Sequence, residues 1–335
     1  MTHADQIAGL LDRYIDDQIT TTTGPLREQL QRAADNLTIT RRELDAALER
    51  ISELENTPPP APAPHPEYGV PAGTKLQKYT GPAAITTPGA TFRRTLFTSR
   101  VDVRAPGVTF EECAATNPSG DLFTCTNKDI RDVVLRRCTM RPSAASTSTI
   151  GIVGHDFTLD ACDISGTVDG VRIHNTSDRT APARVYIRGT RIHDLCWTSP
   201  YSGHADNETH NDAIQIESGS GEIEITDTIL SAYGDIVYGN IVDNPRGPHV
   251  MTGLIVTPNV GPVSGVLVER VTFEGGYAAV NISEKSYGPV KGIVIRDARF
   301  KGDTTTGKDI LAPATTRPLL TIVNSLRMDG SPARL

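Results

Sequence analysis

The stretch VVLRRCTM, residues 133–140, has a form that recurs seven times between Val108 and Phe300. Two apolar residues flank a variable one, two variable residues follow, and a small residue, a variable residue and a last apolar residue complete the unit. The copies are VTFEECAA (108–115), VVLRRCTM (133–140), FTLDACDI (157–164), VYIRGTRI (185–192), IEITDTIL (223–230), VLVERVTF (266–273) and IVIRDARF (293–300). A unit this short cannot bury its own apolar face, so the copies are expected to stack as a solenoid.

A second short strand is expected after most copies, introduced by Gly or Asp. The candidates are Asp169–Ile173, Asp212–Ile216, Gly234–Tyr238 and Ala279–Ile282. Two or three short strands per turn of 24–28 residues is the geometry of a right-handed parallel β-helix, with rungs about 4.8 Å apart. Two longer intervals hold extra material: a loop over Asp194–Asn211, and an irregular rung through Gly253–Val256.

Three cysteines occupy the small position of consecutive copies: Cys113, Cys138 and Cys162. The pattern predicts a column of buried thiols that act as small hydrophobic residues. The total of five cysteines is odd, and their spacings do not resemble a zinc site. We therefore expect no disulfide framework, no metal and no cofactor.

The N-terminal part, residues 1–56, has a different period. Apolar or small residues recur at alternating steps of four and three over residues 26–54, as in the a/d seam of a coiled coil. Oligomerisation is assigned to the large apolar residues of this seam: Leu26, Leu30, Leu37, Leu44, Ile51 and Leu54. The alternative is an amphipathic helix that packs on its own chain. The predicted fold class is thus mainly β, a right-handed parallel β-helix preceded by an α-helical coiled coil.

Three further segments follow the predicted stalk. Residues 57–67 are rich in Pro and Ala, a composition typical of semi-rigid extended spacers. Residues 68–104 are expected to form short strands and turns that cap the rod. Residues 105–335 are expected to form the β-helix body.

Composition excludes some classes of function. The net charge is −7 without a basic patch, so nucleic-acid binding is not expected. No apolar run approaches the roughly 20 residues of a membrane span, and no signal peptide is visible after Met1. We expect synthesis in a cytoplasm and no membrane insertion.

The long loop is the leading candidate for a binding site. It combines the single tryptophan of the chain with other rings and polar groups: Trp197, Tyr201, His204, Asp206 and His210. Aromatic rings beside hydroxyl-binding groups are typical of sugar sites. The alternative is that Trp197 and Tyr201 only hold the loop against the rod.

A row of aspartates is a second candidate. Stacking places Asp169, Asp212 and Asp235 near one another, and stacked carboxylates raise one another's pKa, as an acid/base pair requires. Other acids on neighbouring rungs are Asp194, Asp206 and Glu217. The alternative is that Asp serves as an ordinary turn residue before a strand. The spacings His204-x-Asp206 and His210-x-Asp212 are weak indications of a metal site.

The octapeptides and the strand His210–Ile216 resemble the repeats of the pectate-lyase-like superfamily of right-handed β-helices, over roughly residues 100–330. The resemblance implies the fold, which serves lyases, hydrolases, adhesins and phage tailspikes. The polygalacturonase motifs are absent, and the lyases' calcium-binding aspartates and catalytic arginine have no counterpart. No catalytic residue is therefore carried over.

The whole arrangement resembles a minor tail protein of a phage that infects actinobacteria. This implies a homotrimeric fibre or spike in the virion tail, which docks on other tail-tip proteins and contacts host cell-envelope glycan. One alternative is a polysaccharide depolymerase, a glycoside hydrolase or lyase that uses aspartates of stacked rungs. Another is a cellular scaffold or adhesin.

Overall fold

The structure is a computed structural model of the chain. It describes Gly9, Leu10, Arg13, Arg41 and residues 68–335 without 145, 147, 175–182, 198–200, 206 and 233–250. The chain divides into two compact units, Met1–Pro60 and Ala61–Leu335, and all described strands belong to the second. The predicted coiled-coil residues Leu26, Leu30, Leu37, Leu44, Ile51 and Leu54 lie outside the described residues.

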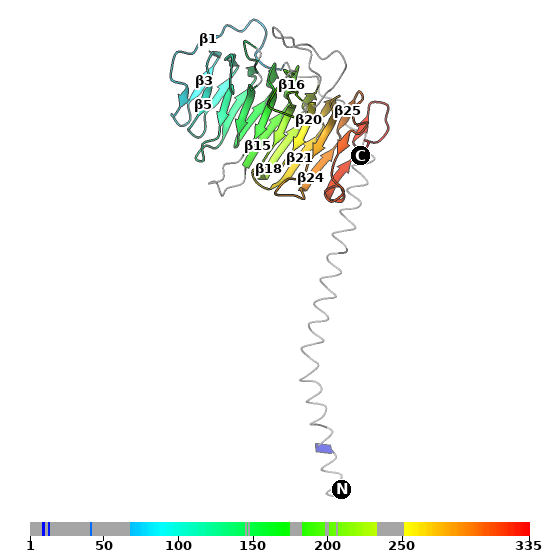
Figure 1. Ribbon diagram of the computed structural model, residues 1–335. Helices are drawn as coiled ribbons and strands as arrows, with labels where there is room; N and C mark the ends of the chain where they lie inside the picture. Colours follow the sequence, from blue (N-terminus) through cyan, green and yellow to red (C-terminus); the bar gives the residue numbers. More distant parts are fainter. Residues whose placement is uncertain are drawn as a thin grey trace. The chain divides into compact units, whose positions relative to one another are not determined.

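The second unit consists of three parallel β-sheets (Figure 1). Sheet A contains β1 (Gln77–Lys78), β4 (Thr95–Phe97), β7 (Ala114–Ala115), β10 (Thr139–Met140), β13 (Asp163–Ser165), β16 (Arg191–His193), β19 (Ile229–Ser231), β22 (Thr272–Glu274), β25 (Arg299–Lys301) and β28 (Leu326–Arg327). Sheet B contains β2 (Ala84–Ile85), β5 (Val101–Val103), β8 (Phe123–Cys125), β11 (Ile150–Gly154), β14 (Asp169–Ile173), β17 (Asn211–Ile216), β20 (Met251–Val256), β23 (Ala278–Ile282) and β26 (Ile310–Leu311). Sheet C contains β3 (Thr91–Arg93), β6 (Thr109–Glu111), β9 (Val133–Arg136), β12 (Phe157–Asp160), β15 (Ala183–Arg188), β18 (Gly219–Thr226), β21 (Val263–Glu269), β24 (Lys291–Arg296) and β27 (Leu320–Val323).

The chain visits the sheets in the order A, B, C, and each strand pairs in parallel with the strand one turn earlier and one turn later. This is a parallel β-helix, consistent with the right-handed form expected for parallel crossovers. The mainly β prediction is confirmed for the described part of the chain. Among those residues the second unit contains one short 3₁₀ helix, η1 (Arg317–Leu319), and no α-helix.

The repeat found in the sequence is the turn from sheet C to sheet A. Phe157 pairs with Val133 on one side and with Val185 on the other, so the copies stand in register. The same turn also occurs in ATFRRTLF (90–97), a further copy, and in LTIVNSLR (320–327), which has Arg327 at the last apolar position; their β3 and β27 end sheet C. Segment 68–104 contributes β1 to β5 to the same three sheets.

One detail of the prediction is wrong. Gly253–Val256 is not an irregular rung, because it belongs to β20, which pairs regularly with β17 and β23 of sheet B. The interval is long because residues 233–250 intervene between β19 and β20, and the predicted strand Gly234–Tyr238 lies in that undescribed stretch.

The turn from sheet C to sheet A has the same backbone in every rung. The residue before the small position is left-handed, with φ between 44° and 54°, at Arg94, Glu112, Arg137, Ala161, Gly189, Asp227, Arg270, Asp297 and Asn324. The small side chain bends back toward the preceding rung: the thiols of Cys138 and Cys162 donate to the carbonyls of Phe110 and Leu135 at 3.4 and 3.3 Å. The position is buried in the rungs of the three cysteines, where the side chain contacts a backbone carbonyl of the preceding rung.

The cysteine column is confirmed. The backbone nitrogen of Thr139 donates to the carbonyl of Cys113, and that of Asp163 donates to the carbonyl of Cys138, both at 2.9 Å. All three cysteines are buried and free. The column therefore runs through three adjacent rungs.

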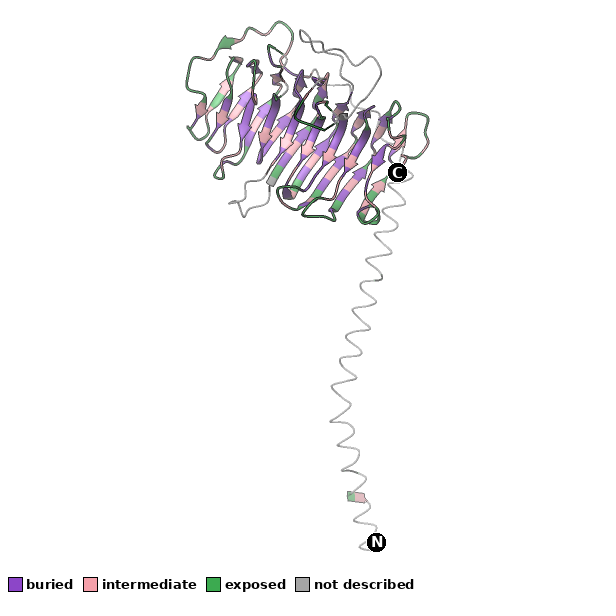
Figure 2. Cartoon of the chain, in the orientation of Figure 1, coloured by how far each residue is buried: buried purple, intermediate pink, exposed green. Residues whose placement is uncertain are grey.

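The core occupies the inside of the three sheets, where buried residues form continuous rows (Figure 2). All seven phenylalanines of the chain lie in it or pack against it. Phe92 and Phe110 stack at 5.2 Å between ring centroids, and Phe273 and Phe300 stack at 5.3 Å. Stacking of like residues on successive rungs gives the narrow column its apolar contacts.

An N-terminal strap, residues 68–76, precedes β1. The backbone nitrogen of Gly69 donates to the carbonyl of Ala161 at 2.8 Å, and that of Val70 to the hydroxyl of Thr139 at 2.9 Å. Gly69 therefore lies beside β10 and β13, whereas β1 is the first strand of sheet A. The strap therefore crosses successive rungs, from β10 and β13 in the middle of sheet A back to its edge strand, β1.

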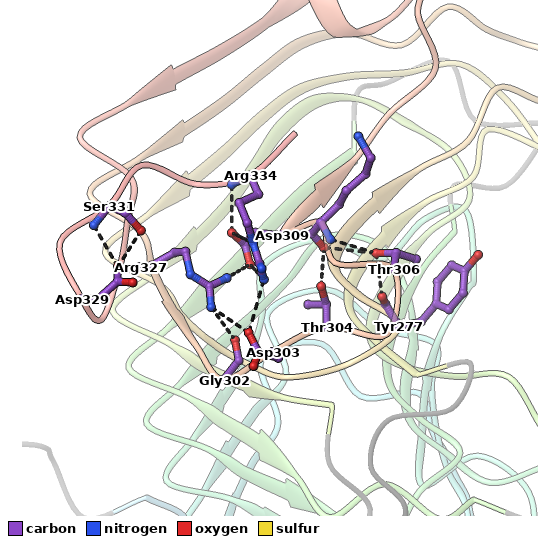
Figure 3. A network of polar contacts seen from close by, with 11 residues as sticks. Tyr277, Gly302, Asp303, Thr304, Thr306, Asp309, Arg327, Asp329, Ser331 and Arg334 are labelled. Carbon is purple, nitrogen blue, oxygen red and sulfur yellow. Dashed lines mark hydrogen bonds and ion pairs between the residues drawn. The ribbon is translucent and has the colours of Figure 1, made fainter.

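The C-terminal end is closed by a clamp around Asp309 (Figure 3). Its buried carboxylate accepts hydrogen bonds from the guanidinium of Arg327 at 2.7 Å and from the backbone nitrogen of Arg334 at 2.8 Å. The backbone nitrogens of Asp309 and Ile310 donate in turn to the carbonyl of Arg334. The last residues are thus fastened across the end of sheet B.

Candidate functional site

The outer face of sheet B carries the most unusual polar groups of the body. Val171 and Ile173 of β14 point into the core, so Arg172 between them points outward. Because Val171 pairs with Ile214, Asp169 and Asp212 hold equivalent positions on adjacent rungs. The backbone nitrogen of Asp212 donates to Oδ1 of Asp169 at 3.1 Å, and Arg172 donates to Oδ2 of Asp169 at 2.7 Å. The structure therefore brings these two predicted aspartates together.

Both carboxyl groups are protonated more readily than a free aspartate. Burial raises the pKa of Asp169, against the opposing effect of Arg172. Burial also raises the pKa of Asp212 well above its usual range, and the charge of Asp169 adds to the increase. Two buried carboxyls on adjacent rungs thus raise each other's tendency to hold a proton, which is one requirement of an acid/base pair.

A half-buried row of hydrogen-bonding side chains continues along the same face. Arg172 Nε donates to Oε1 of Gln215 at 2.9 Å. His174 Nδ1 lies 3.5 Å from Oε2 of Glu217, and Asn259 donates to Oε1 of Glu217 at 3.3 Å. The contact with His174 lowers the pKa of Glu217. We call Arg172, His174, Gln215, Glu217 and Asn259 the sheet B row.

The long loop between β16 and β17 presents a stack of rings where it joins this sheet. His204 and His210 stack at 4.0 Å with an interplanar angle of 4°, and Tyr201 lies 5.5 Å from His204. The two histidines are exposed, and Tyr201 is half-buried. His210 is followed directly by β17, which carries Asp212, Gln215 and the approach to Glu217. The ring stack therefore precedes the same strand that carries Gln215 and leads to Glu217 of the sheet B row.

Trp197 has a different role from the other rings. It is half-buried and packs against the hydrophobic core. Its position fits the alternative reading, in which it holds the loop against the rod.

The remaining predicted aspartates lie either outside the described residues or on another sheet. Thr252, not Asp235, pairs with Asp212 on the next rung of sheet B, and Asp206 and Asp235 lie outside the described residues. Asp194 follows β16 and accepts from His193 Nδ1 at 2.6 Å on the side of sheet A. Asp169 and Asp212 are the aspartates of the predicted row that the described residues place side by side.

Sequence reasoning missed Arg172, His174 and Gln215. Their signal is the alternation within the second strands, Asp-Gly-Val-Arg-Ile-His over 169–174 and Asp-Ala-Ile-Gln-Ile-Glu over 212–217. In register, the two strands place polar residues opposite polar residues at every outward position.

No group of three or more His, Cys, Asp or Glu side chains within the described ranges is arranged to hold a metal ion. In the same ranges no helix has both the length and the apolar composition of a membrane span. Comparison with known protein families, with characterised proteins and with solved structures gives no match.

Proposed function

We propose that the chain is an attachment protein of a bacteriophage tail, a minor tail protein whose β-helix body binds host cell-envelope glycan. Residues 26–54 assemble a homotrimer in this proposal and dock it on other tail-tip proteins. The single observation that favours glycan binding is the ring stack of Tyr201, His204 and His210 at the start of β17, the strand that carries Gln215 of the sheet B row. Stacking rings and hydroxyl-binding side chains are the two elements of a sugar site.

The phage context is supported by the order of the parts in the sequence. A heptad segment, a Pro/Ala segment and a β-helix follow one another, as in the tail proteins that the chain resembles. The β-helix supplies a rigid rod whose loops are free to vary. The fold by itself does not determine function, so the site carries the proposal.

Binding of the purified full-length chain to immobilised actinobacterial envelope polysaccharides tests the proposal. Tyr201→Ala and His204→Ala are expected to weaken binding about tenfold or more, since each removes a stacking ring worth about 1–3 kcal/mol. Tyr186→Ala is the matched control, because Tyr186 is an aromatic residue on the outer face of sheet C, beneath Arg188. Equal losses in all three variants, or binding by none of the proteins, would contradict the proposal.

Polysaccharide cleavage is a second candidate, favoured by the adjacent Asp169 and Asp212 and their raised pKa values. Incubation with the same polysaccharides, followed by measurement of new reducing ends, tests it. A depolymerase would release oligosaccharides, and Asp212→Asn would abolish the release while leaving the fold intact. Binding without release would leave attachment as the function.

A further inference from the structure

The charges on the outer face of sheet B restrict the class of glycan, on the premise that the body binds glycan as proposed above. From β8 to the residues after β17 this region holds the carboxyl groups of Asp121, Asp169, Asp212 and Glu217. The basic groups described beside them are Arg100, Arg172 and His174.

Each basic group already faces a carboxyl group. Arg172 donates from Nη2 to Asp169 at 2.7 Å and from Nε to Gln215 at 2.9 Å. His174 lies 3.5 Å from Glu217. Arg100 lies near Asp121 and lowers its pKa, although burial raises that pKa overall. On the described β14 and β17 strands and the residues directly after them, both basic groups, Arg172 and His174, have a carboxyl partner.

An acidic sugar needs a basic group that is free to bind it. Carboxylate and phosphate groups are recognised by charge-assisted hydrogen bonds, most often from a bidentate arginine. A uronate at this face would have to displace Asp169 from Arg172 and then lie near the buried carboxyl group of Asp212. Breaking a buried pair in this way leaves an uncompensated charge, which is strongly unfavourable.

Neutral sugars fit the same groups without displacement. Glu217 and Asn259 present an acceptor beside a donor, 3.3 Å apart. Gln215, the neighbouring outward-facing residue of β17, adds an amide. Neighbouring hydroxyls of a sugar ring donate and accept at such paired groups. The ring stack of Tyr201, His204 and His210 provides the flat apolar surface that the face of a pyranose needs.

An exposed tyrosine extends the aromatic surface. Tyr277 precedes β23, whose Ala278 pairs with Thr252, itself the partner of Asp212. Tyr277 therefore lies at the N-terminal end of β23, as His210 lies at the N-terminal end of β17, two rungs away. Tyr277 is 36 % exposed, and its backbone carbonyl accepts a hydrogen bond from the hydroxyl of Thr306 (Figure 3). We infer that the ligand is a neutral glycan chain, bound along the rod through its hydroxyls and ring faces, and not an acidic polymer.

Fractionation of the envelope polysaccharides tests this inference. Anion exchange separates them into a neutral flow-through and a retained acidic fraction, and binding of the full chain to each is measured at about 50 and 500 mM NaCl. Binding is expected in the neutral fraction, unchanged by salt, and at least about tenfold weaker in the acidic fraction. Tyr277→Ala is expected to weaken binding to the neutral fraction.

A charge variant makes the test sharper. Glu217→Gln keeps the shape of the side chain but removes one negative charge and frees His174, so binding to the acidic fraction should increase about threefold or more. Glu222→Gln on sheet C, whose side chain is 61 % exposed, is the matched control and should change neither fraction.

The outcomes separate the two claims. Tight, salt-sensitive binding to the acidic fraction alone would overturn the inference and leave glycan attachment standing. Binding to neither fraction would overturn glycan attachment as well.

Discussion

Two single residues, Gly69 and His193, hold neighbouring segments of the body together. Gly69 has φ +73°, and a Cβ there would lie 2.5 Å from Oγ1 of Thr139 and 2.8 Å from Cβ of Asp163. The strap can approach sheet A closely only because residue 69 has no side chain. His193 is held on both ring nitrogens, by Asp163 at 3.1 Å and Asp194 at 2.6 Å.

The first prediction concerns the strap. Gly69→Ala should detach it and lower the free energy of unfolding by about 2–3 kcal/mol, because the methyl group overlaps backbone-anchored atoms. Gly73→Ala is the control, since Gly73 has φ +79° but nothing within 4 Å of the added carbon. It should cost only about 1 kcal/mol, from the left-handed backbone. Limited proteolysis and thermal unfolding measure the difference, and equal effects would contradict close packing of Gly69.

The second prediction concerns pH. Burial opposes the charge on His193, but hydrogen bonds to Asp163 and Asp194 outweigh it and raise its pKa to about 9. The unfolded value is about 6.5, so the imidazolium stabilises the fold fully below pH about 6.5, and this stabilisation disappears as pH rises through about 9.

Relative to His193→Gln, the natural chain should therefore lose about 2–3 kcal/mol of unfolding free energy between pH 6 and pH 10. Denaturant unfolding at both values measures it. A difference between the two proteins that does not change with pH would show that His193 is neutral in the fold.

At the scale of the elements, the outer face of sheet C carries a ladder of alternating charge. Arg93, Glu111, Arg136, Asp160 and Arg188 hold the same strand position on five successive rungs. Contacts of 3.1 Å between Arg93 and Glu111 and of 2.9 Å between Arg136 and Asp160 link neighbours of opposite sign. A slip of one strand by one residue would separate these opposite charges and turn their side chains to the other face, so the ladder favours the observed register.

A parallel ladder occupies the left-handed residues of the turn, and it gives the third prediction. Glu112 lies between Arg94 at 2.9 Å and Arg137 at 3.6 Å, with its side chain 16 % exposed. Glu112→Ala should cost about 1–2 kcal/mol, since two arginines then face each other without a carboxylate. Glu222→Ala, at an exposed pair, should cost less than about 0.5 kcal/mol. If Glu112→Ala and Glu222→Ala lowered the free energy of unfolding equally in chemical denaturation, the ladder would have no structural role.

The sequence predicts the sheet C to sheet A turn well because that turn is built from local rules. The residue before the small position is left-handed in every rung, so the same spacing repeats. The sheet B strands follow loops of unequal length and show no fixed period. For this reason the sequence does not identify Gly253–Val256 as part of a regular sheet B strand.

The candidate site is only partly readable from the sequence for the same reason. Asp169 and Asp212 are recognisable as strand starts, whereas the contacts of Arg172 with Gln215 and of His174 with Glu217 depend on a register across 43 residues. Whether Trp197 packs against the core or binds a glycan also depends on the conformation of the loop, which no local sequence pattern specifies.

At the scale of the whole molecule, each rung contacts only its neighbours, so stability spreads along the rod from end to end. The C-terminal clamp therefore stabilises the neighbouring rungs against local unfolding as well as its own residues. Asp309→Ala leaves Arg327, whose side chain is 14 % exposed, without its buried partner. We expect a loss of about 3–5 kcal/mol and hydrogen exchange that is fastest in β26 to β28 and fades toward β20.

Asp329→Ala, on the same tail, is the control for this fourth prediction. Asp329 is exposed and bonds only Ser331 in the contacts around it, so its loss should leave exchange in β26 to β28 unchanged. Faster exchange throughout the rod, without an end-to-end gradient, would contradict the role of the clamp in closing one end.

The central claim is that the rungs stack in register, since both the sheet B row and the ring stack depend on it. Anomalous diffraction from sulfur in crystals of the protein tests this most directly. The stacking predicts that the sulfur atoms of Cys113, Cys138 and Cys162 form a single line of three peaks, spaced by about one strand separation of 4.8 Å. Peaks scattered through the molecule, or separated by much more than one rung, would contradict it.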